Sequence, residues 1–305
     1  MISIVVPFYN ERDSVEKLFY RLREVCARMS EEHEFIFVDD GSHDGTIDRM
    51  KKLSPLRIIR LARNYGQTQA LGVGIRHARG DIIITLDGDL ENDPADIPLL
   101  LQKLHEGYDV VSGWRKNRWN DKLFSRRIPS SIANTLISVV SGVQLHDHGC
   151  ALKAYRRFVL ERVRLTGEMH RMIAAYAARE GARVAEVHVH FHPRVHGASK
   201  YGLSRTFRVL LDILAFHFFY KYAHRPIHFF GGAGFLSFFI GFLAFLGMLY
   251  FKYFLGTSFI QTPLPVVVAL CVIIGFQFIL MGLLAEIVAR NVSVDEGLKF
   301  TMFEN

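Results

Sequence analysis

Two carboxylates, Asp87 and Asp89, stand two residues apart at the end of the apolar run 81–86. That run is rich in β-branched residues and predicts a strand, so the two carboxylates would lie at its carboxyl end. Oxygen ligands at this spacing can both reach one hard divalent cation, and such a cation can bridge the two phosphates of a nucleotide diphosphate. Asp and Gly are also common in turns, so the pair alone predicts either a metal site or a turn.

Three other polar clusters also follow short apolar runs. They are PFYNE at 7–11, DDGS at 39–42 and RNYG at 63–66. Parallel α/β sheets bind ligands at the carboxyl ends of their strands, so all four clusters are expected at one edge of a sheet. The cluster at 39–42 has an ordinary alternative, a turn followed by Thr46 as a helix N-cap. The chain contains neither a Walker A loop nor GxGxxG, which argues against P-loop NTPases and dinucleotide enzymes.

The elements that would position these clusters alternate along the first two hundred residues. Strands are predicted at 2–6, 35–38, 57–60, 81–86 and 109–112, with helical patterns between them, such as 14–29 and 67–78. This alternation is typical of an α/β domain with a mostly parallel sheet, predicted here for residues 1–200.

Composition agrees with a folded protein of about two domains. The 305 residues are 50% hydrophobic and 22% charged, which excludes a disordered chain. The three cysteines lie far apart in the sequence, which excludes a disulfide scaffold or a zinc knuckle and favours a reducing compartment. Residues 1–110 carry 14 basic and 19 acidic side chains, whereas residues 111–225 carry 20 and 7. Because this basic segment adjoins an apolar region, its expected partners are anionic lipid headgroups or a phosphorylated substrate rather than nucleic acid.

The last third of the chain predicts a membrane hairpin. No charged residue occurs from Pro226 to Phe251, and a second uncharged stretch ends at Ala285, so spans are predicted at 227–251 and 264–288. Basic residues before the first span and after the second place both termini in the cytoplasm by the positive-inside rule. Nothing at the N-terminus predicts a signal peptide. Glycines in the spans allow close helix contacts within one chain or in a homo-oligomer; they are Gly231, Gly234, Gly275 and Gly282.

Residues 201–225, just before the hairpin, include an amphipathic helical pattern. Phe207, Leu211 and Phe218 lie on its apolar side, and Arg205 and Arg208 lie opposite. The pattern predicts a juxtamembrane helix in the membrane interface, and its alternative is a surface helix packed on the globular domain. Residues 291–305 are predicted to form a cytoplasmic tail.

The order of these motifs is more specific than any one of them. VVPFYNE, VDDGSHDGT, the Asp-x-Asp, ARNYGQTQALGVGIRHARGD and a carboxy-terminal pair of spans resemble the family 2 glycosyltransferases of the Rossmann-like GT-A fold. More narrowly, the chain resembles the polyprenyl-phosphate glycosyltransferases, the group that contains dolichol-phosphate mannose synthases and bactoprenol glucosyltransferases. The resemblance implies inverting transfer of a sugar from a UDP- or GDP-sugar to a polyprenyl phosphate at the membrane.

The resemblance also implies a role for individual residues on the donor side. The base and ribose of the nucleotide sugar would be held by Pro7, Tyr9, Glu11 and Asp39. Mg²⁺ or Mn²⁺ would be bound by Asp87, Asp89 and Glu91.

On the acceptor side, the resemblance assigns the lipid phosphate to Arg115, Arg127 and Ser131. Arg194 would contact the donor diphosphate or the acceptor, since a guanidinium offers a permanent charge and a planar fork suited to phosphate oxygens. Asp147 is expected either to position the acceptor, to act as a weak base, or to form an ordinary turn.

Several interpretations stay open. His188, His190 and His192 alternate on a predicted strand and would share one face, where they would form either scaffold or a zinc site. A processive polysaccharide synthase is an alternative function, although the chain lacks the QxxRW motif of those enzymes. A membrane-anchored scaffold with an inactive transferase domain is the other alternative, and an intact Asp-x-Asp argues against it.

Overall fold

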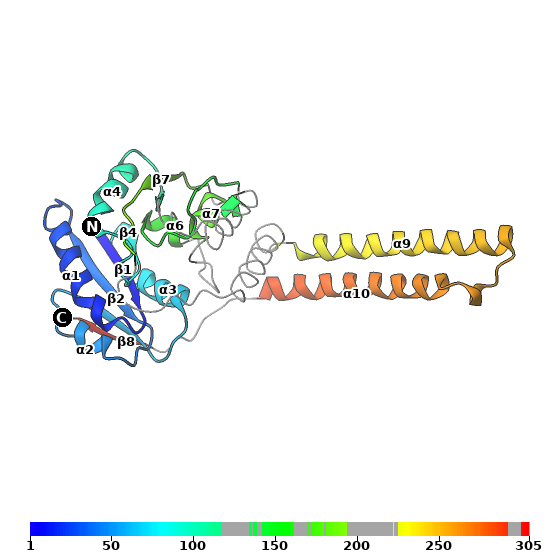
Figure 1. Cartoon of the computed structure of the whole chain (residues 1–305), viewed down its shortest axis with the longest axis horizontal. Helices are drawn as coiled ribbons and strands as arrows, with labels where there is room; N and C mark the ends of the chain where they lie inside the picture. The colour runs from blue at the N-terminus through cyan, green and yellow to red at the C-terminus, as the bar shows by residue number, and fades with distance from the viewer. Residues whose placement is uncertain are drawn as a thin grey trace. The chain divides into compact units, whose positions relative to one another are not determined.

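The computed structural model forms two compact units, Met1–Ile213 with Gly297–Asn305, and Leu214–Glu296 (Figure 1). It describes residues 1–116, 134–135, 137–138, 142–161, 170, 172–179, 181–193, 222, 225–291 and 300–304. The predicted amphipathic segment 201–225 lies almost wholly outside the described residues.

The first unit is built on an eight-stranded sheet with the order β7-β5-β6-β4-β1-β2-β3-β8. Its strands are β1 (Ile2–Phe8), β2 (His33–Asp39), β3 (Arg57–Leu61), β4 (Ile82–Thr85), β5 (Val110–Trp114), β6 (Lys153–Arg156), β7 (Val184–His188) and β8 (Phe300–Glu304). Only β6 and β8 run antiparallel to their neighbours. The predicted α/β fold with a mostly parallel sheet is confirmed, and each of the five predicted strands has its counterpart.

Helices cover both faces of this sheet. They are α1 (Arg12–Cys26), α2 (Thr46–Met50), α3 (Gln67–His77), η1 (Pro94–Asp96), α4 (Ile97–His105), α6 (Arg157–Glu161) and α7 (Ile173–Arg179). Side chains of α1 and α4 share one buried cluster with alternate residues of β1 and β2, and side chains of α3 and α7 share the other. Because successive strand residues point to opposite faces, both faces of the central strands are apolar and buried.

The sequence does not predict the carboxy-terminal strand β8. The predicted tail 291–305 contains this strand, which pairs antiparallel with β3 from Arg57↔Glu304 to Leu61↔Phe300. The chain therefore leaves the first unit, passes through the second, and returns to complete one edge of the same sheet (Figure 1).

The second unit is a helical hairpin of α9 (Pro226–Leu255), η4 (Phe259–Gln261) and α10 (Leu264–Asn291). Both long helices are apolar enough to cross a membrane, and at 1.5 Å per residue α9 is roughly 45 Å long. The structure has helices at both predicted positions, and α9 extends beyond the predicted end through Lys252 to Gly256, whose φ of 67° ends the helix.

Small residues let α9 and α10 approach closely (Figure 1). A Cβ on Gly234 would lie 2.9 Å from the carbonyl oxygen of Gly275, and Ser237 donates a hydrogen bond of 2.8 Å to the carbonyl of Cys271. A Cβ on Gly231, by contrast, would meet no atom of α10 within 4 Å among the described residues. Large apolar side chains elsewhere on both helices are exposed, as lipid-facing side chains would be.

Candidate active site

The loops after β2 and β3 are locked together by Asp40. Its buried carboxylate accepts hydrogen bonds from the backbone N–H groups of Tyr65 (2.8 Å) and Gly66 (2.9 Å). Burial, together with the neighbouring charge of Asp39, raises the pKa of Asp40. Gly41 has a φ of 69°, and a Cβ there would lie 2.5 Å from the backbone of Arg63, so the close approach of the two loops requires glycine.

Asp39 is fully buried at the end of β2 and retains acceptor capacity. Its Oδ1 accepts from the N–H of Ser42 at 3.2 Å. Its Oδ2 has no hydrogen bond within the described part of the chain, although Arg60 Nε lies 3.6 Å away. A buried carboxylate oxygen in this state is suited to accept from a ligand, because buried acceptors are normally satisfied.

The predicted base and ribose residues lie on adjacent strands or their loops. Pro7 pairs in register with Val38, and Phe8 pairs with Asp39. Beyond them, the N–H of Glu11 donates to Thr46 Oγ1 at 3.0 Å, and Tyr9 is exposed. The structure therefore brings the ends of β1 and β2 together, as the sequence predicts.

The loop after β4 carries Asp87 and Asp89 in a constrained backbone. Gln67 Nε2 donates to Asp87 Oδ1 at 2.5 Å, and Asp89 Oδ1 accepts from the N–H of Glu91 at 3.0 Å. Leu90 adopts a φ of 65°, a left-handed conformation that is costly for leucine. Such strain is concentrated at ligand-binding sites.

The oxygen donors of this loop suit a hard divalent cation. Within the described ranges, however, no three His, Cys, Asp or Glu side chains converge as a ready metal site. The predicted ligands Asp87, Asp89 and Glu91 thus form no ready three-carboxylate site, and a hard cation there would need further oxygen ligands.

Arg115 and Asp147 form a buried ion pair beside this loop. Arg115 Nε and Nη2 donate to the two carboxylate oxygens of Asp147 at 2.8 and 3.1 Å, and Arg115 Nη1 lies 3.8 Å from Glu91 Oε2. Burial alone would lower the pKa of Arg115, but the charge of Asp147 raises it above its usual value. The guanidinium predicted to receive a lipid phosphate is therefore held by carboxylates of its own chain, and the Arg115 side chain is 2% exposed.

Lys153 and His148 extend the charged cluster into the core. Lys153 Nζ donates to the carbonyl of His148 at 2.9 Å, and both side chains are buried. Burial lowers the pKa of Lys153 to about 8. Burial, reinforced by the charge of Lys153, lowers the pKa of His148 to about 4, so this histidine is neutral at pH 7. The sequence does not single out Lys153, because the residue belongs to no recognisable motif. The one available signal is a lysine at the start of the short strand β6.

The three alternating histidines have separate partners. His188, the last residue of β7, stacks on Trp114 with ring centroids 4.3 Å apart. His190 and His192 lie beyond the strand and pair with Asp96 (2.7 Å) and Asp93 (2.9 Å). These contacts tie the segment after β7 to the segment after the Asp-x-Asp loop, which is a scaffold role.

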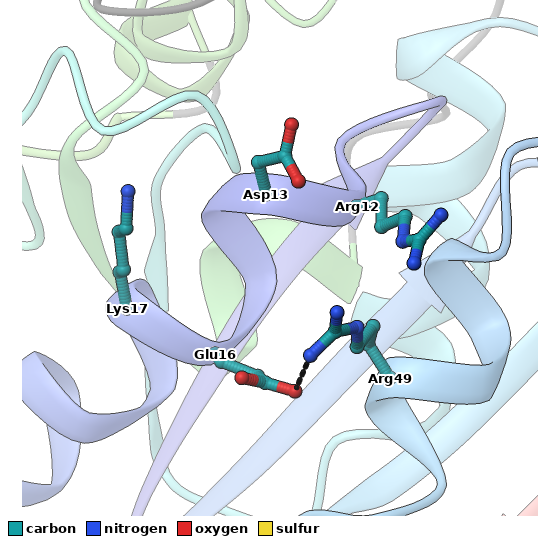
Figure 2. A pocket seen from close by; sticks show the side chains of 5 residues that line it. All are labelled: Arg12, Asp13, Glu16, Lys17 and Arg49. Atoms are coloured by element: carbon teal, nitrogen blue, oxygen red, sulfur yellow. Dashed lines mark hydrogen bonds and ion pairs between the residues drawn. The ribbon is translucent and has the colours of Figure 1, made fainter.

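Three predicted site residues, Arg127, Ser131 and Arg194, lie outside the described residues. Figure 2 shows a surface pocket at the start of α1, where Glu16 pairs with Arg49 at 2.9 Å. None of the predicted site residues lines this pocket, whose side chains form a charged contact between α1 and α2.

Comparison with known proteins agrees with this architecture. Residues 3–164 match the family model described as Glycosyl transferase family 2. Among solved structures, glucosyl-3-phosphoglycerate synthase from Mycobacterium tuberculosis in complex with Mn²⁺ and uridine-diphosphate-glucose superposes with a TM-score of 0.57 at 19% identity, covering 71% of this chain and 78% of that one. At that identity the similarity shows the fold.

Two curated relatives align over almost the whole chain, including the helical hairpin. Dodecaprenyl-phosphate galacturonate synthase of Rhizobium johnstonii is 45% identical, over 97% of this chain and 89% of its own length. Undecaprenyl-phosphate 4-deoxy-4-formamido-L-arabinose transferase of Shewanella sediminis is 36% identical, over 95% of this chain and 87% of its own. With the family model spanning more than half of its residues, this membrane protein belongs to the family 2 glycosyltransferases.

Proposed function

We propose that the protein transfers a sugar from a UDP- or GDP-sugar to a polyprenyl phosphate, with inversion at the anomeric carbon. The observation that carries the proposal is the alignment with a dodecaprenyl-phosphate galacturonate synthase at 45% identity over 97% of the chain. Because this alignment includes the hairpin as well as the sheet domain, it relates the whole membrane enzyme and not only a nucleotide-binding half.

The donor would bind across the carboxyl ends of β1, β2 and β4. Asp39, whose buried Oδ2 has no hydrogen bond among the described residues, would accept from the base or ribose, with Pro7, Tyr9 and Glu11 beside it. Asp87 and Asp89, with Glu91 as a further candidate ligand, would hold Mg²⁺ or Mn²⁺. When bound, such an ion stabilises the negative charge that develops on the departing diphosphate.

The acceptor phosphate would supply the nucleophile directly. The second pKa of a phosphate monoester is about 6, so its oxygen is largely ionised at neutral pH and needs no strong general base. One phosphate oxygen would form a bond to the anomeric carbon while the bond from that carbon to the diphosphate breaks, releasing a nucleoside diphosphate. Asp147 then has no necessary role as a base, and its contact with Arg115 favours a positioning role.

Arginines would bind the acceptor phosphate, with Arg127, Ser131 and Arg194 in the roles that the family resemblance implies. Arg115 would reach a phosphate through Nη1, because Asp147 accepts hydrogen bonds from its Nε and Nη2. The contact with Asp147 would keep the guanidinium paired throughout, as its burial requires.

The hairpin would keep this site at the cytoplasmic face of the membrane. Both ends of the hairpin lead into one folded unit, because β8 pairs with β3 after the chain has passed through α9 and α10. This connectivity supports a topology in which both ends would emerge on the same side of the bilayer, and the flanking basic residues favour the cytoplasm as that side.

The test is transfer of radiolabel by the purified protein in detergent or vesicles. A panel of UDP- and GDP-sugars, with nucleotide-linked galacturonic acid first, would be offered together with undecaprenyl phosphate and Mg²⁺ or Mn²⁺. The proposal expects label in an organic-extractable lipid that is labile to mild acid, in proportion to added polyprenyl phosphate. Label that stays water-soluble with every donor would contradict it.

A further inference from the structure

Glu186 lies in β7, an edge strand, and its side chain is largely buried. It stands opposite Ser112 of β5 in the parallel register, and its side chain is 11% exposed. Its carboxylate faces the 146–147 segment. A carboxylate that is removed from water at this level requires compensating hydrogen bonds.

Those hydrogen bonds come from two successive residues of the active-site segment. Glu186 Oε1 accepts from the backbone N–H groups of His146 and Asp147, both at 3.0 Å. Glu186 Oε2 accepts from the N–H of His146 at 3.1 Å and lies 2.8 Å from His146 Nδ1. Successive N–H groups that converge on one anion form a small anion-binding nest, and hydrogen bonds to a charged acceptor are the stronger kind.

The segment held in this way carries the carboxylate that orients Arg115. Asp147 meets the Arg115 fork through two hydrogen bonds of 2.8 and 3.1 Å, a bidentate geometry that tolerates little displacement. The third nitrogen of the guanidinium lies 3.8 Å from Glu91, in the loop of the Asp-x-Asp. A continuous series of polar contacts therefore runs from Glu186 to the proposed donor site.

We propose that Glu186 is a positioning residue that acts through Asp147. Its carboxylate fixes the backbone of His146 and Asp147, and this fixes the direction in which Asp147 presents Arg115 to the reacting phosphates. The catalytic part of this inference rests on the proposed function, which supplies the reacting phosphates. The contacts of the Glu186 carboxylate with the backbone of His146 and Asp147, called the clamp below, belong to the fold itself. Glu186 touches no proposed ligand, so its effect should disappear when Asp147 can no longer act.

The clamp also has an optical reporter. His146, whose ring is held by Glu186, stacks on Trp114 with centroids 3.9 Å apart and planes inclined by 10°. Trp114 and Trp119 are the two tryptophans of the chain. In a Trp119→Phe background, the fluorescence of Trp114 therefore reports whether His146 keeps its place.

The test is a double-mutant cycle in the full-length protein, with Glu186→Gln, Asp147→Asn and the double variant. Glu186→Gln keeps the size of the side chain but places an NH₂ against an N–H donor. It is expected to lower kcat about 10- to 100-fold, because small displacements of reacting groups are costly, while the KM for the nucleotide sugar changes less than about threefold. In the Asp147→Asn background the same change should lower kcat less than threefold, because residues that act through one another are not additive. Glu16→Gln, which removes a carboxylate from an exposed pair with Arg49, is the matched control and should leave kcat unchanged.

Equal losses in both backgrounds would overturn the proposal, as would full turnover by Glu186→Gln. Retained nucleotide binding distinguishes loss of positioning from loss of folding. If Glu186→Gln abolishes nucleotide binding as well, Glu186 is needed for the fold and the proposal is wrong. Failure of the proposed function would show differently, as absence of sugar transfer by the wild-type protein. In that case an unchanged Trp114 spectrum in Glu186→Gln would still refute the clamp, and a changed spectrum would support it.

Discussion

Gly88 lies between Asp87 and Asp89, the two proposed metal ligands, and provides a sharp test of the geometry of their loop. A Cβ added there would lie 2.5 and 2.6 Å from Cδ1 and Cε1 of Phe8. Phe8 is 2% exposed and packs against Phe37 with centroids 4.8 Å apart, so its ring has little room to withdraw. Carbon atoms prefer separations of about 3.5 to 4.0 Å, so in Gly88→Ala the loop must move by about 1 Å.

A displacement of that size has two expected effects. Overpacking a core lowers the free energy of unfolding by about 1–3 kcal/mol. Moving reactive groups by about 1 Å can cost about 100-fold in rate, which corresponds to roughly 2.7 kcal/mol in the activation free energy. We therefore expect Gly88→Ala to lower kcat/KM for sugar transfer about 100-fold in the radiolabel assay.

Gly80 supplies a matched control at the opposite end of the strand. A Cβ there would lie 2.7 Å from the carbonyl oxygen of Met1 and the nitrogen of Ser3, so Gly80→Ala should also destabilise the protein. Because Gly80 precedes β4 rather than following it, folded Gly80→Ala should keep kcat/KM within threefold of the wild type. Full activity in Gly88→Ala, or an equal loss in both variants measured as folded protein, would refute the reasoning about the loop.

Three further predictions follow from the same contacts. Asp89→Ala should abolish transfer and weaken Mn²⁺ binding in electron paramagnetic resonance while leaving thermal unfolding nearly unchanged; normal turnover with saturating Mn²⁺ would remove the metal argument. The pKa of His148 is about 4 in the folded protein and 6.5 in its ordinary state, so the unfolded chain binds more protons between these pH values. The free energy of unfolding should therefore fall by roughly 3 kcal/mol as the pH decreases through this window. His148→Gln should flatten this part of the pH profile in denaturant titrations, and an unchanged slope would assign it to other groups. Truncation after residue 299 removes β8 and leaves β3 as an unpaired edge strand, and Arg60 of β3 lies beside Asp39. The truncated protein should have a lower unfolding temperature and a severalfold higher KM for the nucleotide sugar. An unchanged KM would show that β8 does not support the donor site.

Local patterns were enough to predict the first half of the sheet. β1 to β4 each contain a short apolar run that ends in a polar cluster, and the sheet places these clusters at the strand ends. The two helices of the hairpin could also be predicted. An uncharged apolar stretch of about 20 residues is long enough to cross a bilayer and is uncommon as a buried helix of a soluble domain.

The rest depends on pairing between distant segments. β6 inserts antiparallel between β4 and β5, and this insertion brings the 146–147 segment to Arg115. No periodicity in the sequence indicates that contact, so the sequence predicts Arg115 only as a phosphate ligand and assigns no role to Glu186. Strand β8 is not predictable from the sequence for a similar reason. This five-residue strand is stabilised by its pairing with β3 at the edge of the sheet and has no distinctive pattern of its own.

The most direct measurement of the central claim is sugar transfer by purified protein to undecaprenyl phosphate, compared with transfer to undecaprenol, which lacks the phosphate. We predict acid-labile labelled lipid with the phosphate, none with the alcohol, and one nucleoside diphosphate released for each sugar transferred. Equal labelling of both lipids, or release of the nucleotide without lipid product for every donor in the panel, would contradict the account.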